Sequence, residues 1–526
     1  MVTFMDPPPN AVARATLAGL GDVSPVAPEA GVWALRAAPR ADLRSRVLAR
    51  PGVVAAEWAL SRRSDDVIPT EPAAPLPLQP VAAPTDPLFT QQHQWGLFPG
   101  TTTWGIDLTG FPTRPRIAIL DAGVDSSHPE WSGPDSPLVR PWSAWTGRQA
   151  AEDWGRTGHG THVAGIAAAP ANGLGIVGVA PGRAASAEVI PVQISDRDGY
   201  STDETMMKGI RWAVANGAKV INISAGGTGY SRAFQGVINW AFARGALLVA
   251  SVGNDGQDYA VMNYPAGYAH VLGVAAQCSG RVVPGDCPEP YGLARFSNRN
   301  ASVDVVAPGV DILSSVPRRI TEGAISPGYA VKEGTSMAAP YVAGVAALVF
   351  AANPGATPYQ VMRQLMNTAT DMGAPGHDLS TGDGLINPRA AVSLRIPADD
   401  PQEVNDDASL VRSRGAIEAS RPPSVVSATL DAANDPRDLY PVALRTGQSV
   451  TLRVRAPRGR VRISLWPPGT RSVLPSSAGV RPRPAAATGR PAQSTVLRYV
   501  ANRGGRWLVE IAATAGAPTY RLEVGR

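Results

Sequence analysis

The chain has 526 residues, of which 44% are hydrophobic and 17% are charged, and its formal net charge is +5. At roughly 100–200 residues per domain, this length predicts two to four domains. The basic residues are scattered among acidic ones and form no dense block, which argues against a nucleic-acid partner. The most apolar stretch, residues 338–352, is shorter than the roughly 20 residues that cross a bilayer, so we expect a buried helix there and no membrane span.

The first predicted unit covers residues 1–63. Residues 31–39 alternate in polarity like a strand, residues 41–49 have the spacing of a short helix, and residues 53–60 resemble a second strand. Residues 64–85 are rich in proline and alanine, a composition typical of a linker. We therefore expect a small α+β unit joined to the rest of the chain by this linker.

Apolar strands alternate with helices from residue 116 to about residue 392. The expected strands are residues 117–120, 189–194, 220–223, 247–250, 271–274 and 303–306, and the expected helices include residues 203–216 and 231–244. Continuous Val, Ile and Leu strands between helices predict a parallel sheet covered on both faces. The expected fold class is α/β, a doubly wound and mostly parallel sheet, with its chemistry at the carboxyl ends of the strands.

The last part of the chain follows a different pattern. Residues 393–423 are polar and acidic, which favours a linker. Residues 424–526 contain short alternating runs without an intervening helix, which predicts an all-β sandwich. These runs are residues 441–444, 450–454, 461–465, 507–511 and 520–524.

The two cysteines, Cys278 and Cys287, lie in a segment rich in glycine and proline. A zinc site needs about four ligands, and no second Cys or His pair lies nearby, so a metal site is not favoured. A local disulfide that closes a surface loop is preferred over a free pair, and it would indicate an oxidising compartment.

Two segments bring titratable side chains to the predicted sheet edge. Asp121 ends the strand at residues 117–121, although a strand-end Asp is often only a turn or cap residue. His159 stands at the start of a helix rich in small residues, with His162 three positions later. The two could share a metal, but the His-Glu-x-x-His pattern is absent, so we interpret His162 as a packed core residue.

Two further segments offer a hydroxyl and an amide. Ser336 stands at the start of the most apolar helix, where unpaired N–H groups suit a developing oxyanion, but it could merely cap that helix. Asn254 follows the strand at residues 247–250 and can donate a hydrogen bond, but Asn-Asp-Gly is also common in turns. The combination of all four segments favours catalysis.

Asp121 in Leu-Asp-Ala-Gly-Val-Asp, His159 in His-Gly-Thr-His-Val-Ala-Gly, Asn254 in Gly-Asn-Asp-Gly and Ser336 in Gly-Thr-Ser-Met-Ala-Ala-Pro resemble the subtilisin-like serine proteases, the subtilases of peptidase family S8. The resemblance covers residues 86–392. It implies that Ser336 is the nucleophile, His159 the general base and Asp121 its orienting carboxylate. It also implies that Asn254 and the Ser336 N–H hold the oxyanion.

The same resemblance implies a substrate-binding surface. Ser224, Ala225 and Gly226 match the segment that pairs with the substrate backbone, and Ala225 replaces a larger apolar residue there. Ser251 and Gly253 are expected to line the first specificity pocket.

Two residues match a family calcium site. Glu130 and Asn172 are the expected ligands, because oxygen donors suit calcium, while the alternative is an ordinary turn held by Asn172. No cofactor is expected for the chemistry itself.

The flanking units have resemblances of their own. Residues 1–63 are similar to a subtilase propeptide, which makes residues 64–85 an activation linker. Residues 424–526 resemble the bacterial pre-peptidase C-terminal domain, although the role of this sandwich stays open.

Together these resemblances imply a secreted, monomeric serine endopeptidase made as a self-processing zymogen, although residues 1–10 show no signal peptide. Its partners would be protein or peptide substrates and its own propeptide as an intramolecular inhibitor. The alternatives are a processing protease of narrow specificity, an inactive protease-fold binding protein, and a scaffold for the C-terminal sandwich.

Overall fold

The computed structural model describes residues 1–4, 7–38, 42–63, 84–91, 94–97, 111, 113–133, 136–181, 187–256, 262–281, 285–400, 402–408, 411, 414–419, 423–430, 435–457, 459–470, 472–474, 483–515 and 519–526. Most of the predicted linker at 64–85 lies outside them. Contacts divide the chain into two compact units, one of residues 1–58, 231–239 and 400–526, the other of residues 59–230 and 240–399.

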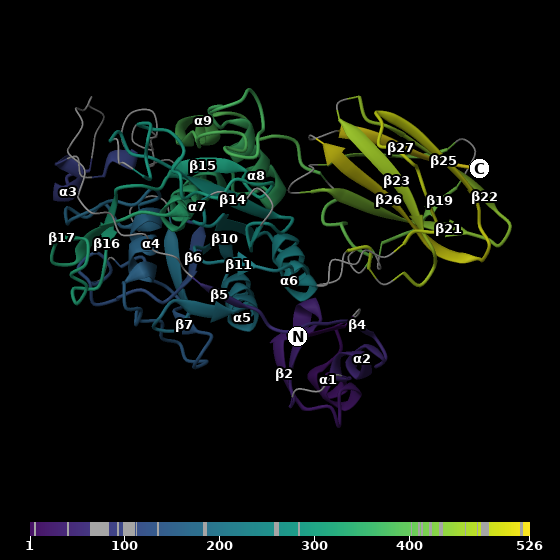
Figure 1. Ribbon diagram of the computed structural model, residues 1–526, viewed down its shortest axis with the longest axis horizontal. Coiled ribbons are helices and arrows are strands. Elements are labelled where there is room, and N and C mark those ends of the chain that lie inside the picture. Colours follow the sequence, from purple (N-terminus) through teal and green to yellow (C-terminus); the bar gives the residue numbers. More distant parts are fainter. Residues whose placement is uncertain are drawn as a thin grey trace. The chain divides into compact units, whose positions relative to one another are not determined.

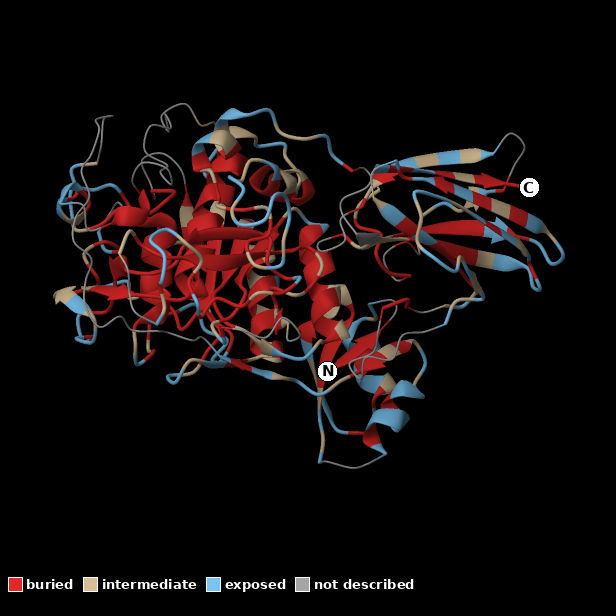
Figure 2. Cartoon of the chain, turned by 45° about the horizontal axis from the view of Figure 1, so that its top comes forward, coloured by how far each residue is buried: buried red, intermediate tan, exposed pale blue. Residues whose placement is uncertain are grey.

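A seven-stranded parallel sheet forms the centre of the second unit, in the order β15-β14-β12-β10-β6-β8-β7 (Figure 1). Its strands are β6 (Arg116–Asp121), β7 (Trp142–Ser143), β8 (Glu188–Gln193), β10 (Ala218–Ile223), β12 (Leu247–Ser251), β14 (Val271–Gln277) and β15 (Val305–Pro308). The predicted α/β sheet is confirmed. Its strands are buried along most of their length because neighbouring strands and helices cover them, as Figure 2 shows in red.

The strand order reverses between β6 and β10. From β6 the chain passes to β7 and β8 on one side, and it then returns to place β10, β12, β14 and β15 on the other. In such sheets ligands bind at the carboxyl ends of the strands beside the reversal. Asp121 ends β6, Ser224 follows β10 and Ser251 ends β12, so this edge gathers the predicted site.

Helix α7 is a buried core helix of this unit and contacts helix α4 and strands β10, β12, β14 and β15. By length and composition it could cross a membrane, but 94% of its apolar window is buried within the protein, as expected for a core helix. The helices are α3 (Pro87–Thr90), α4 (His159–Ala168), α5 (Asp203–Ala215), α6 (Arg232–Phe242), α7 (Thr335–Ala352), α8 (Pro358–Asn367) and α9 (Pro388–Ser393), with the 3-10 turn η2 (Trp95–Leu97).

Three small sheets complete this unit. They are β5 (Ser61–Arg63) with β9 (Tyr200–Thr202), β11 (Gly227–Thr228) with β13 (Asn263–Tyr264), and β16 (Ile312–Ser315) with β18 (Tyr329–Lys332) and β17 (Ala324–Ser326). The short arginine-bearing strand β5 was not expected, because its residues have no apolar alternation of their own. It forms by pairing with partners that are distant in sequence.

The N-terminal residues form a four-stranded antiparallel sheet, ordered β2-β3-β1-β4. Its elements are β1 (Val2–Phe4), α1 (Asn10–Thr16), β2 (Asp22–Ala27), η1 (Pro28–Ala30), β3 (Val32–Arg36), α2 (Leu43–Leu48) and β4 (Val53–Ala56). Phe4 and Trp33 pack edge to face at 5.1 Å in its core. The predicted α+β character holds, and β4 is shorter than the predicted strand at residues 53–60.

Two β-sheets form the C-terminal part, ordered β19-β21-β26-β23-β24 and β20-β27-β22-β25. The strands are β19 (Ile417–Glu418), β20 (Ser424–Thr429), β21 (Arg437–Leu444), β22 (Ser449–Arg455), β23 (Arg460–Trp466), β24 (Ala486–Ala487), β25 (Ser494–Val500), β26 (Gly505–Ala515) and β27 (Thr519–Gly525). All strand pairs are antiparallel except β19 with β21. Alternate residues such as Val450, Leu452 and Val454 meet Trp507 in a shared core, which confirms the all-β prediction.

Candidate active site

Asp121 and His159 form a buried hydrogen-bonded pair. Both carboxylate oxygens of Asp121 lie 2.8 Å from Nδ1 of His159, the first residue of α4. The Ala122 N–H donates to Asp121 Oδ1 at 2.7 Å and helps to fix the carboxylate. An N–H on Nδ1 donates to the carboxylate, which leaves Nε2 as the basic nitrogen of the ring.

Ser336 lies in the first turn of α7, which begins after Gly334. Its hydroxyl donates to the Ser224 carbonyl at 3.4 Å, and the Ser224 hydroxyl donates to the Ser336 carbonyl at 2.8 Å. The segment that follows β10 is therefore held beside Ser336. The positive end of the α7 dipole favours negative charge at this place.

Asn254 is oriented by the same helix start. Its Oδ1 accepts hydrogen bonds from the Thr335 N–H at 2.9 Å and from the Thr335 hydroxyl at 2.8 Å. Because the carbonyl oxygen of the amide is held by Thr335, its NH2 group is turned away from Thr335 and is oriented as a donor. The preceding Gly253 has φ +101°, and a Cβ there would lie 1.9 Å from Asn263 Nδ2, so a side chain does not fit.

The predicted substrate-binding residues line the same edge. Ser224, Ala225 and Ser251 are buried, and Gly226 exchanges backbone hydrogen bonds with Arg63 in both directions at 2.9 Å. A cavity of about 420 Å³ lies beside His159, and Arg63, Ala122, Arg197 and Tyr200 are among its lining residues. Arg63 thus lines a cavity that also borders His159 of the Asp121–His159 pair.

Residues 113–384 match the subtilase family model. Over 277 residues, 52% of this chain and 90% of the relative, the sequence is 36% identical to subtilisin BL of Lederbergia lenta. The chain belongs to the subtilase family of serine-type endopeptidases.

Fervidolysin of Fervidobacterium pennivorans is 37% identical over 323 residues, which are 56% of this chain and 44% of that protein. Its crystal structure, described as that of a keratinolytic enzyme related to subtilisin, aligns with a TM-score of 0.63 at 22% identity. The alignment covers 99% of this chain and 91% of that chain. The subtilase fold identified from the sequence is therefore confirmed.

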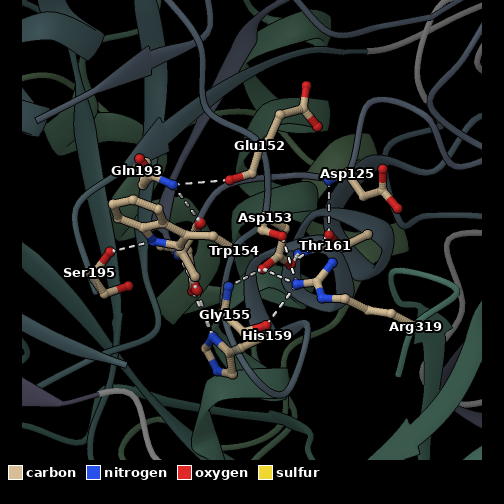
Figure 3. A network of polar contacts seen from close by, with 12 residues as sticks. Asp125, Glu152, Asp153, Trp154, Gly155, His159, Thr161, Gln193, Ser195 and Arg319 are labelled. Carbon is tan, nitrogen blue, oxygen red and sulfur yellow. Dashed lines mark hydrogen bonds and ion pairs between the residues drawn. The ribbon is translucent and has the colours of Figure 1, made fainter. Parts of the chain in front are cut away.

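A network behind the pair supports the first turn of α4 in the subtilase domain (Figure 3). The buried Asp153 accepts hydrogen bonds from the Thr161 N–H at 2.9 Å, the Thr161 hydroxyl at 2.6 Å and the Gly155 N–H at 3.0 Å. Arg319 donates to the carbonyls of Asp153 and Gly155. Asp153 belongs to no sequence motif and was therefore not predicted, although its partner Thr161 lies within the histidine motif.

Replacing Asp153 with asparagine is expected to flatten part of the pH dependence of stability. Burial raises the pKa of Asp153 to about 6 from 3.8, so the native state binds this proton more tightly than the unfolded state does. The wild type should therefore lose up to about 3 kcal/mol of unfolding free energy as pH rises from about 4 to about 6. Thermal unfolding across this range should show a smaller loss in Asp153→Asn. An unchanged slope, or an equal change in the exposed neighbour variant Glu152→Gln, would contradict this assignment.

His162 and the cysteines have structural positions. His162 is fully buried, and its Nε2 lies 3.1 Å from the carbonyl oxygens of Ile312 and Ala330, as expected for a packed core histidine. Cys278 and Cys287 are joined by a disulfide bond, with Cα atoms 5.6 Å apart.

The predicted calcium ligands Glu130 and Asn172 lie together. Glu130 Oε1 accepts from the Ile176 N–H and the Tyr329 hydroxyl at 2.9 Å, and Asn172 Nδ2 is 3.5 Å from Oε2. Asn172 Oδ1 accepts from the Leu174 N–H at 2.9 Å, so its carbonyl oxygen already holds the turn. The buried Asp86, which the sequence analysis did not single out, accepts from the Asn172 N–H at 3.1 Å. Because oxygens of both residues already accept hydrogen bonds, this geometry favours an ordinary turn held by Asn172 over a calcium site.

A second group of acidic residues lies in the C-terminal sandwich. Carboxylate oxygens of Glu403, Asp435 and Asp438 lie within 4.8 Å of one another. Asp435 is 0% exposed, and neither of its oxygens accepts a hydrogen bond from any residue that the structure describes. Burial, followed by repulsion between neighbouring carboxylates, raises the pKa of Asp435 and Asp438 well above the usual value. Carboxylate oxygens are the type of ligand that suits a calcium ion.

Proposed function

We propose that this chain is a serine endopeptidase that cuts peptide bonds through an acyl-enzyme intermediate on Ser336. The observation that carries the proposal is the Asp121–His159 pair, because two carboxylate oxygens at 2.8 Å fix the ring with Nε2 as the base. Ser336 at the start of α7 provides the nucleophile.

The proposed reaction follows from these groups. His159 Nε2 takes the Ser336 proton as Oγ attacks the substrate carbonyl, and it later gives that proton to the leaving amine. Asp121 stabilises the imidazolium. The Ser336 N–H and Asn254 Nδ2 donate to the oxyanion, and loss of such a side-chain donor lowers kcat about 10²–10³-fold, a magnitude measured on a subtilisin. Water then releases the acyl group.

The chain is further proposed to be a secreted zymogen that processes itself. Residues 1–63 would act as the propeptide, residues 64–85 as the activation linker and residues 86–392 as the catalytic domain. Strand β5 supports this arrangement, since it pairs with β9 and with Gly226 in the manner of a bound substrate. Monomeric action on protein or peptide substrates is the simplest form of this function, and a processing protease of narrow specificity is the alternative.

A purified full-length chain tests the proposal. Incubation should produce a new N-terminus between Arg63 and Asp86, and a fluorophosphonate probe should label the wild type. Ser336→Ala should remain uncut and unlabelled, while Ser132→Ala, which changes an exposed serine, should behave like the wild type. A correctly folded wild type that neither labels nor cleaves would overturn the proposal.

We also propose a calcium site in the sandwich, held by Glu403, Asp435 and Asp438, with the Glu130–Asn172 turn as the second candidate. The unbonded oxygens of the buried Asp435, judged against the residues that the structure describes, support this choice. Bound calcium would neutralise the mutual repulsion of these carboxylates and so stabilise this part of the fold.

A further inference from the structure

Arg62 is a fully buried arginine whose guanidinium is held on all sides by the subtilase unit. Its Nε donates to Asp203 Oδ1 at 2.6 Å, and both side chains are 0% exposed. Nη1 donates to the carbonyls of Gly227 at 2.8 Å and Tyr264 at 2.9 Å, and Nη2 lies 3.3 Å from the Gly229 carbonyl. Burying an unpaired cation is costly, so these acceptors are what allow the Arg62 guanidinium to be buried.

The pocket is shaped for a guanidinium. One carboxylate and three backbone carbonyls accept from three nitrogens of the guanidinium, whose N–H groups point in different directions. The single ammonium nitrogen of a lysine cannot reach all of these acceptors. Asp203 is the first residue of α5, where the helix dipole favours a negative charge whether or not an arginine is present. Its backbone N–H also donates to the Leu60 carbonyl at 2.9 Å, so one residue binds both the backbone and the side chain of the incoming strand.

The pairing register of the strand gives the number of residues between the arginine in this pocket and the residue beside Ser336. Arg63 pairs with Gly226 in the antiparallel sense, so a substrate in the same register places its residue two positions later opposite Ser224. Ser224 is the residue whose carbonyl accepts the Ser336 hydroxyl. The arginine in the pocket therefore precedes the residue beside the nucleophile by three positions.

We propose that Asp203 makes this pocket an arginine-selective subsite, which rests on the proposed function and narrows its substrate class. Substrates carry arginine three residues before the residue whose carbonyl is attacked. The first such substrate is the chain itself. Arg62 fills the pocket from within, and the matching bond joins Asp65 to Asp66, so Asp66 is the expected new N-terminus.

Peptide binding tests the subsite without requiring hydrolysis. Fluorescently labelled peptides of residues 59–63, with arginine or with leucine at the position of Arg62, are titrated against the full-length Arg62→Ala, Ser336→Ala chain and followed by anisotropy. The internal segment competes equally in both titrations, so the ratio of the two Kd values isolates the arginine. The arginine peptide should bind about 10–100-fold more tightly, as expected for a charge-assisted hydrogen bond.

Variants of the pocket complete the test. Asp203→Asn in the same chain should reduce that ratio to near one, while Glu204→Gln, which changes the neighbouring acid paired with Lys208, should preserve it. Equal binding of both peptides by the parent chain would overturn the subsite. If the chain that retains Ser336 is not labelled by a fluorophosphonate, the proposed hydrolysis is contradicted, but the ratio of the two Kd values is unaffected.

With an active chain, a quenched peptide of residues 59–69 should be cut between the positions of Asp65 and Asp66. Its kcat/KM should fall about 10–100-fold when leucine or lysine replaces the arginine that matches Arg62. A cut elsewhere, or equal rates for the three peptides, would refute the register and the selectivity respectively.

Discussion

Asp121→Asn is expected to lower kcat for peptide hydrolysis about 10⁴-fold, a magnitude known from the same change in a serine protease of another fold. In the wild type both carboxylate oxygens accept the proton on His159 Nδ1. An asparagine can turn its NH2 group toward Nδ1, which then accepts, and this moves the ring proton to Nε2. A protonated Nε2 cannot take the proton of Ser336, so the loss should appear in kcat rather than KM.

Asp125→Asn is the matched control for this prediction. Asp125 lies on the same segment as Asp121, and its carboxylate accepts hydrogen bonds from the N–H and the hydroxyl of Ser127. It should retain near wild-type kcat, and both variants should keep the thermal midpoint of the parent. A kcat for Asp121→Asn within about tenfold of the wild type would show that Asp121 does not control the proton of His159.

Calcium is expected to stabilise the C-terminal sandwich by about 3 kcal/mol when about 1 mM is added to chelator-treated protein, if the site binds at about 10 μM. Without calcium, burial holds the pKa of Asp435 and Asp438 high, so ionising them as pH rises lowers the stability of the fold. Calcium binds the ionised form, so its stabilising effect should grow with pH. Differential scanning calorimetry in chelator and in calcium measures both effects.

Asp435→Asn is expected to change the unfolding temperature in opposite directions with and without calcium. In chelator, at a pH above the raised pKa of Asp435, the variant should unfold at a higher temperature than the wild type, because it removes a buried carboxylate charge that lacks hydrogen bonds from the described residues. In calcium it should unfold at a lower temperature, because it removes a ligand. Glu418→Gln changes an exposed acid in β19 and should respond to calcium as the wild type does. The same order of midpoints in both conditions would contradict the site.

The sequence predicted the sheet because its strands carry their own signal. Continuous apolar runs such as residues 220–223 and 247–250 are buried on both faces wherever they lie in the sheet, and alternating runs such as residues 450–454 need one buried face. The motifs around Asp121, His159, Asn254 and Ser336 were equally local, since each depends on a strand end or a helix start. Their chemistry could therefore be proposed before the chain was folded.

Features built from distant residues could not be found in this way. Arg62 and Asp203 are 141 positions apart in the sequence. Asp435 and Tyr520 both lie next to Asp438, although one comes early and the other late in the sequence of the sandwich. The acidic residues predicted to lie in a linker include Asp400, Asp406 and Asp407, which are buried. A charged side chain looks like solvated surface in a sequence, because its partners and its burial are set by the folded chain.

The amino-acid sequence by itself determined the family and the fold class, and it supplied the proposal for the catalytic side chains, because local hydrophobic periodicity and short motifs carry this information. Only the tertiary structure decided which charges are buried and what surrounds them. It placed Arg62 against Asp203 on the strand whose next residue pairs with Gly226, and it gathered Glu403, Asp435 and Asp438 into one group. The proposed substrate selectivity and the proposed metal site both depend on such long-range pairing, since desolvation makes each of these charges require a partner.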